Sequence, residues 1–175
     1  FALAILVMSY NLMFGFTGVI SFGHALFFGL GGYAIGMWWQ YTEMDPNLAL
    51  FLGLITTLVL TGIVGFIIGL VSLRLRGIYF AIFTLAVAEM AFIYVGRWAY
   101  TGGEDGFSIG RLPTWIDPSQ NRLNLYYIGL VLFALSFIFI YLLVKSPTGS
   151  VFQAIRETEE RAKSIGYNTL RYKLF

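Results

Sequence analysis

The stretch PNLALFLGLITTLVLTGIVGFIIGLVSL, residues Pro46–Leu73, contains no Asp, Glu, Lys or Arg. A helix that crosses the hydrocarbon core of a bilayer needs roughly 20 consecutive, mainly apolar residues. A charged side chain at the centre of such a helix costs about 2.5–3.5 kcal/mol on insertion scales. The stretch is therefore predicted to be a transmembrane helix, and the chain to be an all-α integral membrane protein.

Charge is missing from most of the remaining chain as well. No acidic or basic residue occurs at 1–42 or at 123–144, and Glu89 is the only one between Gly77 and Gly96. These segments suit tilted helices, whereas barrel strands need only about 9–11 residues of alternating polarity, a pattern that is absent here. We therefore predict a polytopic helix bundle, a single transmembrane domain over residues 1–175, with five spans at about 1–16, 24–41, 48–73, 78–98 and 125–144.

The composition agrees with this class. Hydrophobic residues make up 58% of the chain and charged residues 11%, against about 45–50% and about 25% in soluble domains. The chain has no cysteine and one histidine, which excludes a thiolate site and disfavours any metal site, so no cofactor is expected in it. It opens on an apolar run at Phe1 without a signal-peptide pattern, and we expect it to be part of a longer polypeptide with further spans at both ends.

The basic residues predict an orientation. Cytoplasmic loops of membrane proteins carry an excess of Lys and Arg. If the loop after the third span and the segment after the fifth are cytoplasmic, eight of the eleven Lys and Arg residues lie inside, namely Arg74, Arg76, Lys145, Arg156, Arg161, Lys163, Arg171 and Lys173. The other three, Arg97, Arg111 and Arg122, then lie outside.

Four polar residues are candidates for the substrate pathway. An ionisable residue inside a span is a functional-site hypothesis by default, which singles out Glu89. A Gly-rich break at Gly15–Gly23 contains Thr17 and Ser21 and precedes His24, and broken helices often form transporter sites. The alternatives are a structural hydrogen bond from Glu89 to Thr84 or a tyrosine, and a His24 that is satisfied by water or backbone at the interface.

The sequence also predicts where helices pack closely and where a structured loop lies outside the membrane. The pairs Gly32 and Gly36, and Gly65 and Gly69, have the GxxxG spacing that lets helices approach closely in lipid, although glycine is also common in membrane spans generally. The connection 101–124 contains prolines and several glycines and is predicted to be a structured loop of turns. It either contacts an outside partner or serves as a connector.

The longest polar segment, 146–173, is predicted to contain a short amphipathic helix. Ser150 and Gln153 form a capping-box pattern at its start, and Gly166 is placed to end it. The apolar residues of one face are Phe152, Ile155, Ala162 and Ile165, and two i,i+4 pairs, Glu157 with Arg161 and Glu159 with Lys163, support the helix. Asn168 is placed to cap a following helix. The apolar stripe suits docking into a groove of a soluble partner; a solvated connector or a lipid-bound basic segment is the alternative.

The chain resembles the permease subunits of branched-chain amino acid ABC transporters, specifically the LivM-type member of the pair. Four stretches carry the resemblance, in the family's order: NLMFGFTGVISFGHA at 11–25 with FGLGGY at 28–33, LRLRGIYFAIFTLA at 73–86 with Glu89, TGGEDG at 101–106, and the segment from Gly149 through AIRE at 154–157, ERA at 160–162 and Gly166 to Lys173. The RGIYF and TGGEDG stretches favour the LivM type over its partner permease.

The resemblance implies a role for the polar segment and a set of partners. In the family this segment is the coupling loop, whose helix seats in the ATPase subunit; it corresponds here to Gly149, Ala154, Ile155, Arg156, Glu157, Ala162 and Gly166. The chain has no GxxxxGK[ST] motif, so ATP and Mg²⁺ are expected in a partner ATPase rather than here. A second permease, two ATPase subunits and an external binding protein are the implied partners, and no nucleic acid is expected.

The resemblance further implies import of Leu, Ile or Val across a bacterial or archaeal plasma membrane, with no enzymatic activity in this chain. Related permeases take urea, amides or sugars, so another small solute is an alternative substrate. A gradient-driven secondary transporter that uses Glu89 as its coupling site is an alternative of another class. A membrane scaffold that transports nothing is a third.

Overall fold

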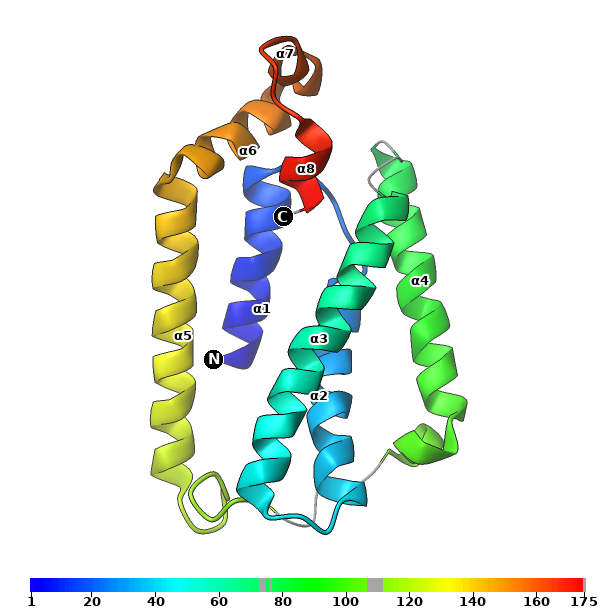
Figure 1. Cartoon of the computed structure of the whole chain (residues 1–175), viewed down its shortest axis with the longest axis vertical. Helices are drawn as coiled ribbons and strands as arrows, with labels where there is room; N and C mark the ends of the chain where they lie inside the picture. The colour runs from blue at the N-terminus through cyan, green and yellow to red at the C-terminus, as the bar shows by residue number, and fades with distance from the viewer. Residues whose placement is uncertain (73–74, 76, 107–111, 175) are drawn as a thin grey trace. The chain divides into compact units, whose positions relative to one another are not determined.

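The described part of the chain folds entirely into helices and their connections. The computed structural model describes residues 1–72, 75, 77–106 and 112–174, and the regular elements in these ranges are all helical, which confirms the all-α fold class. They are α1 (Ala2–Asn11), the π-helical turn η1 (Leu12–Phe16), α2 (His24–Tyr41), α3 (Pro46–Ser72), α4 (Ile78–Arg97), the 3₁₀ turns η2 (Ala99–Thr101) and η3 (Gly103–Asp105), α5 (Arg122–Lys145), α6 (Pro147–Glu157), α7 (Glu159–Ser164) and α8 (Thr169–Leu174) (Figure 1).

Three helices are long and apolar enough to cross a membrane. Within the described ranges these are α3, α4 and α5, and together they support a membrane-embedded protein. The predicted number of five spans is therefore corrected to three by length and composition. The first segment has only ten α-helical residues before the π-turn, and α2, although it has 18 residues, includes His24, Gln40 and several glycines that lower its apolarity.

The helices divide between two compact units. The first unit contains residues 1–22, 68–84 and 127–175, and the second contains 23–67 and 85–126. The basic residues Arg74, Arg76 and Arg111, on which part of the orientation prediction depends, lie outside the described residues.

In the second unit, α2 and α3 pack through small residues and hydroxyl groups. Gly53 of α3 is buried, and a Cβ added to it would lie 3.1 Å from the Cα atom of Ile35. The Thr57 hydroxyl lies 3.4 Å from the Gly31 carbonyl oxygen, to which it donates. The Trp38 indole N–H donates to the Thr56 hydroxyl over 3.0 Å. Such close backbone approach and interhelical hydrogen bonding are what hold helices together in lipid.

The glycines of the two GxxxG pairs lie in different surroundings. A Cβ at Gly65 would lie 3.4 Å from the Phe27 ring, and Gly36 is buried. Gly32 is exposed and a Cβ there would meet no atom within 4 Å. Gly69 is half-buried in the first unit, on the last turn of α3. The close contact of α2 with α3 therefore involves Gly31 and not Gly32.

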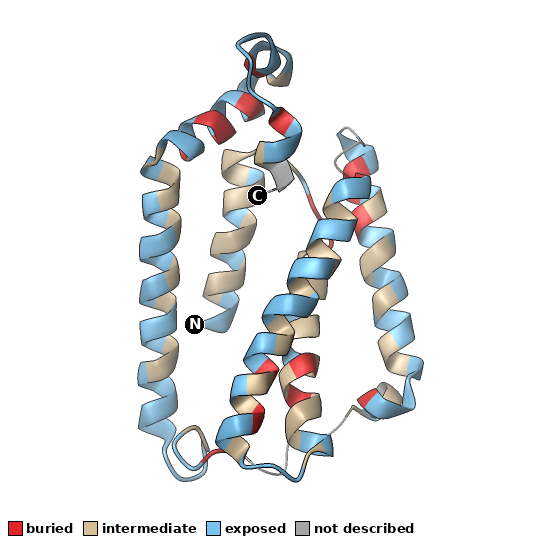
Figure 2. Ribbon diagram, viewed as in Figure 1, coloured by how far each residue is buried: buried red, intermediate tan, exposed pale blue. Residues whose placement is uncertain are grey.

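In the first unit, α1 lies against α5, and α6 turns sharply away from the end of α5 (Figure 1). The Phe1 and Phe133 rings are 5.8 Å apart, centroid to centroid. No residue of α5 is buried, whereas buried residues gather on α6 and on the short helices after it (Figure 2). Within the described residues of this unit, a small apolar cluster is formed by side chains of α6 and α7 and not by the apolar span α5.

Gly53→Leu is expected to destabilise the α2–α3 contact by about 1–3 kcal/mol, because the larger side chain meets backbone at Ile35 that cannot rotate away. The matched control is Gly62→Leu on the same helix, where the glycine is exposed and an added Cβ meets nothing within 4 Å. Thermal unfolding of the full-length protein in detergent measures both. Equal unfolding midpoints for the two variants would contradict the packing described for Gly53.

Candidate functional site

Helix α6 begins earlier than the capping-box pattern predicts. Ser146 is the N-cap, its hydroxyl oxygen accepts from the Gly149 N–H over 3.4 Å, and Pro147 occupies the first turn. Proline is favoured there because its missing N–H would have no intrahelical partner. A Cβ on Gly149 would clash with the Val144 carbonyl oxygen, so glycine permits the sharp turn from α5 into α6.

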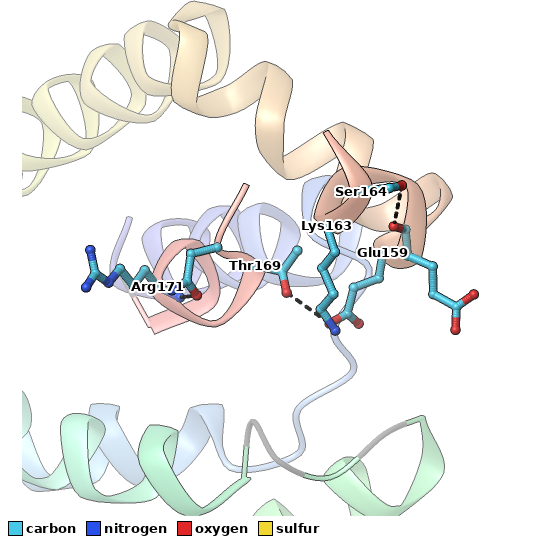
Figure 3. Close-up of polar contacts among 7 residues, drawn as sticks. Glu159, Lys163, Ser164, Thr169 and Arg171 are labelled. Carbon is cyan, nitrogen blue, oxygen red and sulfur yellow. Dashed lines mark hydrogen bonds and ion pairs between the residues drawn. The ribbon is translucent and has the colours of Figure 1, made fainter. Parts of the chain in front are cut away.

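The predicted single helix is two helices. Thr158 has extended backbone angles (φ −154°, ψ 96°) and separates α6 from α7. The predicted ion pair between Glu159 and Lys163 is confirmed, with a separation of 2.8 Å. The same Glu159 carboxylate accepts from the Thr169 hydroxyl over 3.2 Å, which ties α7 to α8 (Figure 3).

The turn after α7 has the predicted capping residues. Gly166 adopts φ +98°, the Gly166 N–H donates to the Lys163 carbonyl and the Tyr167 N–H donates to the Ala162 carbonyl. These two bonds make a Schellman motif, which favours glycine at this position. The Asn168 side chain accepts from the Arg171 N–H over 3.3 Å at the start of α8. Both capping predictions are confirmed.

The apolar stripe of the predicted docking helix faces the chain itself. Val151, Ile155 and Ala162 form a buried cluster against which Tyr172 of α8 packs. Phe152 is also buried, and its ring meets Tyr172 edge to face. The fourth predicted stripe residue, Ile165, is 72% exposed. The expectation that this stripe is free to dock into a partner is therefore corrected, because α7 and α8 already cover most of it.

The surface that α6 leaves free is polar. Its exposed residues include Ser150, Gln153, Ala154 and Glu157. They recur at i, i+3, i+4 and i+7, so they share one face of the helix. We call these four residues the α6 outer face. The capping-box pattern predicts only a helix start at Ser150 and Gln153; the spacing of these two residues with Ala154 and Glu157 is the signal that places all four on one face.

The residues implied for coupling by family resemblance divide into two groups. Gly149, Ile155 and Ala162 are buried and maintain the shape of the segment. Ala154, Arg156, Glu157 and Gly166 are exposed. Arg156 also reaches another element, because its guanidinium donates to the Gly15 carbonyl oxygen in η1.

The Gly-rich break starts as a π-turn and continues as non-helical chain. The Thr17 hydroxyl donates to the Leu12 carbonyl over 3.3 Å, while the Gly18 and Val19 N–H groups donate to the Phe14 and Met13 carbonyls over 3.2 Å each. Further along, Ser21 is buried, and the Phe22 N–H donates to the Thr84 hydroxyl of α4 over 3.2 Å. π-Turns inside helices are frequent at functional sites.

The four pathway candidates fall in both units. Thr17 and Ser21 belong to the first, and His24 and Glu89 to the second. Glu89 is exposed on α4, and His24 is half-buried at the first residue of α2. The Thr84 hydroxyl donates to the Ala81 carbonyl over 3.0 Å. No group of three metal-ligating side chains occurs in the part of the chain that the structure describes.

The loop after α4 consists of short turns, as predicted, within its described residues. Thr101 is fully buried, and its hydroxyl donates to the Trp98 carbonyl over 2.7 Å. The Trp115 indole donates to the Asn47 side chain over 2.8 Å and ties the loop to the start of α3. Hydrogen bonds from the side chain and backbone of Ser119 lower the pKa of Asp117. The described residues of this loop thus form hydrogen-bonded turns within the second unit.

Ile155→Ala is expected to loosen the segment α6–α8, at a cost of about 2 kcal/mol, because a buried methylene-rich side chain is lost from a small cluster. Ile165→Ala is the matched control, since Ile165 is exposed. Limited trypsin digestion of the full-length protein measures the change, with faster cleavage around Arg161 and Lys163 only in the first variant. Equal cleavage rates would contradict an internal role for the stripe.

Comparison with known proteins supports one family. A family model described as "Branched-chain amino acid transport system / permease component" matches residues 1–175. The chain is 31% identical to the high-affinity branched-chain amino acid transport system permease protein LivM of Salmonella typhimurium and 30% identical to that of Escherichia coli, over 97% of this chain and 45% of each relative. A probable LivM permease of Methanocaldococcus jannaschii is 25% identical over 97% of this chain and 58% of that protein.

The chain thus spans about half the length of the curated relatives it matches. No solved structure matches it. The family match covers every residue of the chain, and the three long apolar helices fit a membrane permease. The chain belongs to the permease components of the branched-chain amino acid transport system family.

Proposed function

We propose that the chain is part of a membrane-spanning permease subunit of an ATP-driven ABC importer for the branched-chain amino acids Leu, Ile and Val. The observation that carries this proposal is the family match over residues 1–175. Two bacterial relatives and one archaeal relative are named as branched-chain amino acid permeases, which supports this substrate class and a plasma-membrane location. The proposed domain is one permease domain that includes both compact units and crosses the membrane several times.

The proposed machine has four kinds of subunit. This permease pairs with a second permease, an external binding protein delivers the amino acid, and two cytoplasmic ATPases bind ATP and Mg²⁺. Permeases in this proposal do no chemistry on the substrate. Their work is a change of access, driven by partners that bind one conformation better than the other.

We place the ATPase contact on the α6 outer face, defined above as Ser150, Gln153, Ala154 and Glu157. This face is exposed, and the opposite face is closed by α7 and α8. A small residue, Ala154, at its centre allows close approach by a partner, while the surrounding polar groups can form hydrogen bonds at the rim. The exposed Gly166 lies at the adjoining turn and is included in the proposed contact.

We retain Glu89, His24, Ser21 and Thr17 as candidate pathway residues. Glu89 is the strongest of them, because an exposed carboxylate on an apolar helix needs water or a polar partner in a membrane. A substrate ammonium group or a neighbouring subunit would satisfy it. The gradient-driven alternative assigns the same carboxylate to a proton or ion.

Uptake of labelled leucine by vesicles that hold the full-length complex tests the proposal. We expect uptake to require both ATP and the binding protein. Uptake driven by an ion gradient alone, and lost in Glu89→Gln, would instead establish the secondary transporter. Stimulation of ATP hydrolysis by urea or an amide, without leucine uptake, would keep the ABC machine and replace the substrate.

The docking surface has its own test. Ala154→Trp places a large side chain on the α6 outer face, and we expect it to weaken copurification of the ATPase subunit by roughly tenfold or more. The control is Leu170→Trp on α8, where the native residue is also exposed. If the ATPase copurifies with the Ala154→Trp variant as well as with the control variant, the contact lies elsewhere.

A further inference from the structure

Arg156 joins α6 to the break that follows α1. Its guanidinium donates to the Gly15 carbonyl oxygen, across a sequence separation of 141 residues. The aliphatic stem of the same side chain lies against Gly18, where an added Cβ would be 2.9 Å from the Arg156 Cγ atom and 3.4 Å from its Cβ atom. We call this three-residue contact the Arg156 clasp. It involves elements of the first unit only.

The Arg156 clasp supplies a hydrogen-bond donor and a positive charge at the end of α1 and η1. The last carbonyls of a helix have no partner within it, and basic side chains near that end are favourable because the helix dipole is negative there. Neither α1 nor η1 has a basic residue in its last turn. The Leu12, Met13 and Phe14 carbonyls find donors within the break itself. The Gly15 carbonyl receives its donor, and the helix end its positive charge, from Arg156 of α6.

The far end of the break is held as well. The Phe22 N–H donates to the Thr84 hydroxyl of α4, and both Ser21 and Thr84 are buried. The chain from Gly15 to Phe22 is therefore anchored to α6 at one end and to α4 at the other. Both anchors are single side chains that bond to backbone, so α6 and α4 are linked through a short, largely irregular segment.

We propose that Arg156 is a positioning residue inside the permease, not a contact with a partner: it makes α6 and the Gly15–Phe22 break move together, so that motion imposed on α6 reaches α4. This inference rests on the proposed function, since it takes the ATPase as the source of that motion. It also separates Arg156 from Glu157, its neighbour in the sequence, which lies on the α6 outer face.

The first experiment compares substitutions of Arg156 in the full-length complex reconstituted in vesicles. Arg156→Met keeps the aliphatic stem and removes the donor and the charge. We expect it to retain the ATPase in copurification while ATP-dependent leucine uptake falls about tenfold, the scale of one charge-assisted hydrogen bond. Arg156→Lys, which restores a charged donor, should recover part of that loss. Arg171→Met on α8, an exposed arginine, is the matched control and should transport normally.

The second experiment replaces the clasp by a covalent bond. The chain has no cysteine, and the Cβ separation of 3.4 Å between positions 18 and 156 is close to the roughly 3.5–4.5 Å of disulfides. The variant carries Gly18→Cys and Arg156→Cys, and the reduced form of the same variant controls for strain at φ +74°. We expect the disulfide to form equally with and without ATP, and the oxidised form to transport at close to the rate of the unmodified protein. Reduction should lower uptake about tenfold, as Arg156→Met does.

Three results would overturn the inference. Loss of the ATPase from the Arg156→Met complex would make Arg156 a partner contact. Transport by Arg156→Met at the rate of the unmodified protein would leave the clasp without a role. An oxidised double variant that is inactive, yet active when reduced, would show that the contact must open during the cycle. Failure of the proposed function is recognised separately, because it would appear as ATP-independent uptake by the unmodified complex.

Discussion

The arrangement of the first unit depends on donors for the backbone carbonyls at the end of its first helix. The last carbonyl groups of a helix have no partner within the helix, so they need donors from the following chain, from side chains or from water. Three of these carbonyls accept hydrogen bonds from the chain that follows directly, namely from the Thr17 hydroxyl and from two backbone N–H groups. One carbonyl, that of Gly15, is satisfied from α6. The position of α6 is thus tied to the way α1 ends.

The contact with Arg156 explains why position 18 of the break is a glycine. Gly18 has φ +74°, which favours glycine, and it also lacks the Cβ that would meet the Arg156 stem. A longer side chain at that position would push α6 away from η1 and break the bond to Gly15. The break therefore both interrupts the helix and provides the surface that the Arg156 side chain contacts. That pairing links residues that no local sequence pattern connects.

Local physics made much of the fold predictable. The charge-free run at 46–73 gives α3 almost to the residue, and Gly166 and Asn168 cap the helices they were expected to cap. What could not be predicted depends on contacts between distant segments. The amphipathic pattern of 150–165 shows that one face is buried but not by what, and here α8 buries it through Tyr172. Periodicity likewise could not show that Thr158 breaks the helix or that Arg156 points to Gly15.

Burial of the apolar stripe changes what a partner can do to this segment. A helix that buries its apolar face in a partner binds that partner more tightly, but the same face is then not available to pack against the rest of its own chain. Here the stripe holds α6, α7 and α8 together, and the Glu159 bonds to Lys163 and Thr169 add polar ties (Figure 3). A force applied to the polar face of such a packed segment displaces it as a body, because close-packed cores resist deformation. In the proposed transporter, the ATPase contact and the contact with the break after α1 are therefore made by different residues of one short helix, and the break is the first segment outside α6–α8 to receive the movement.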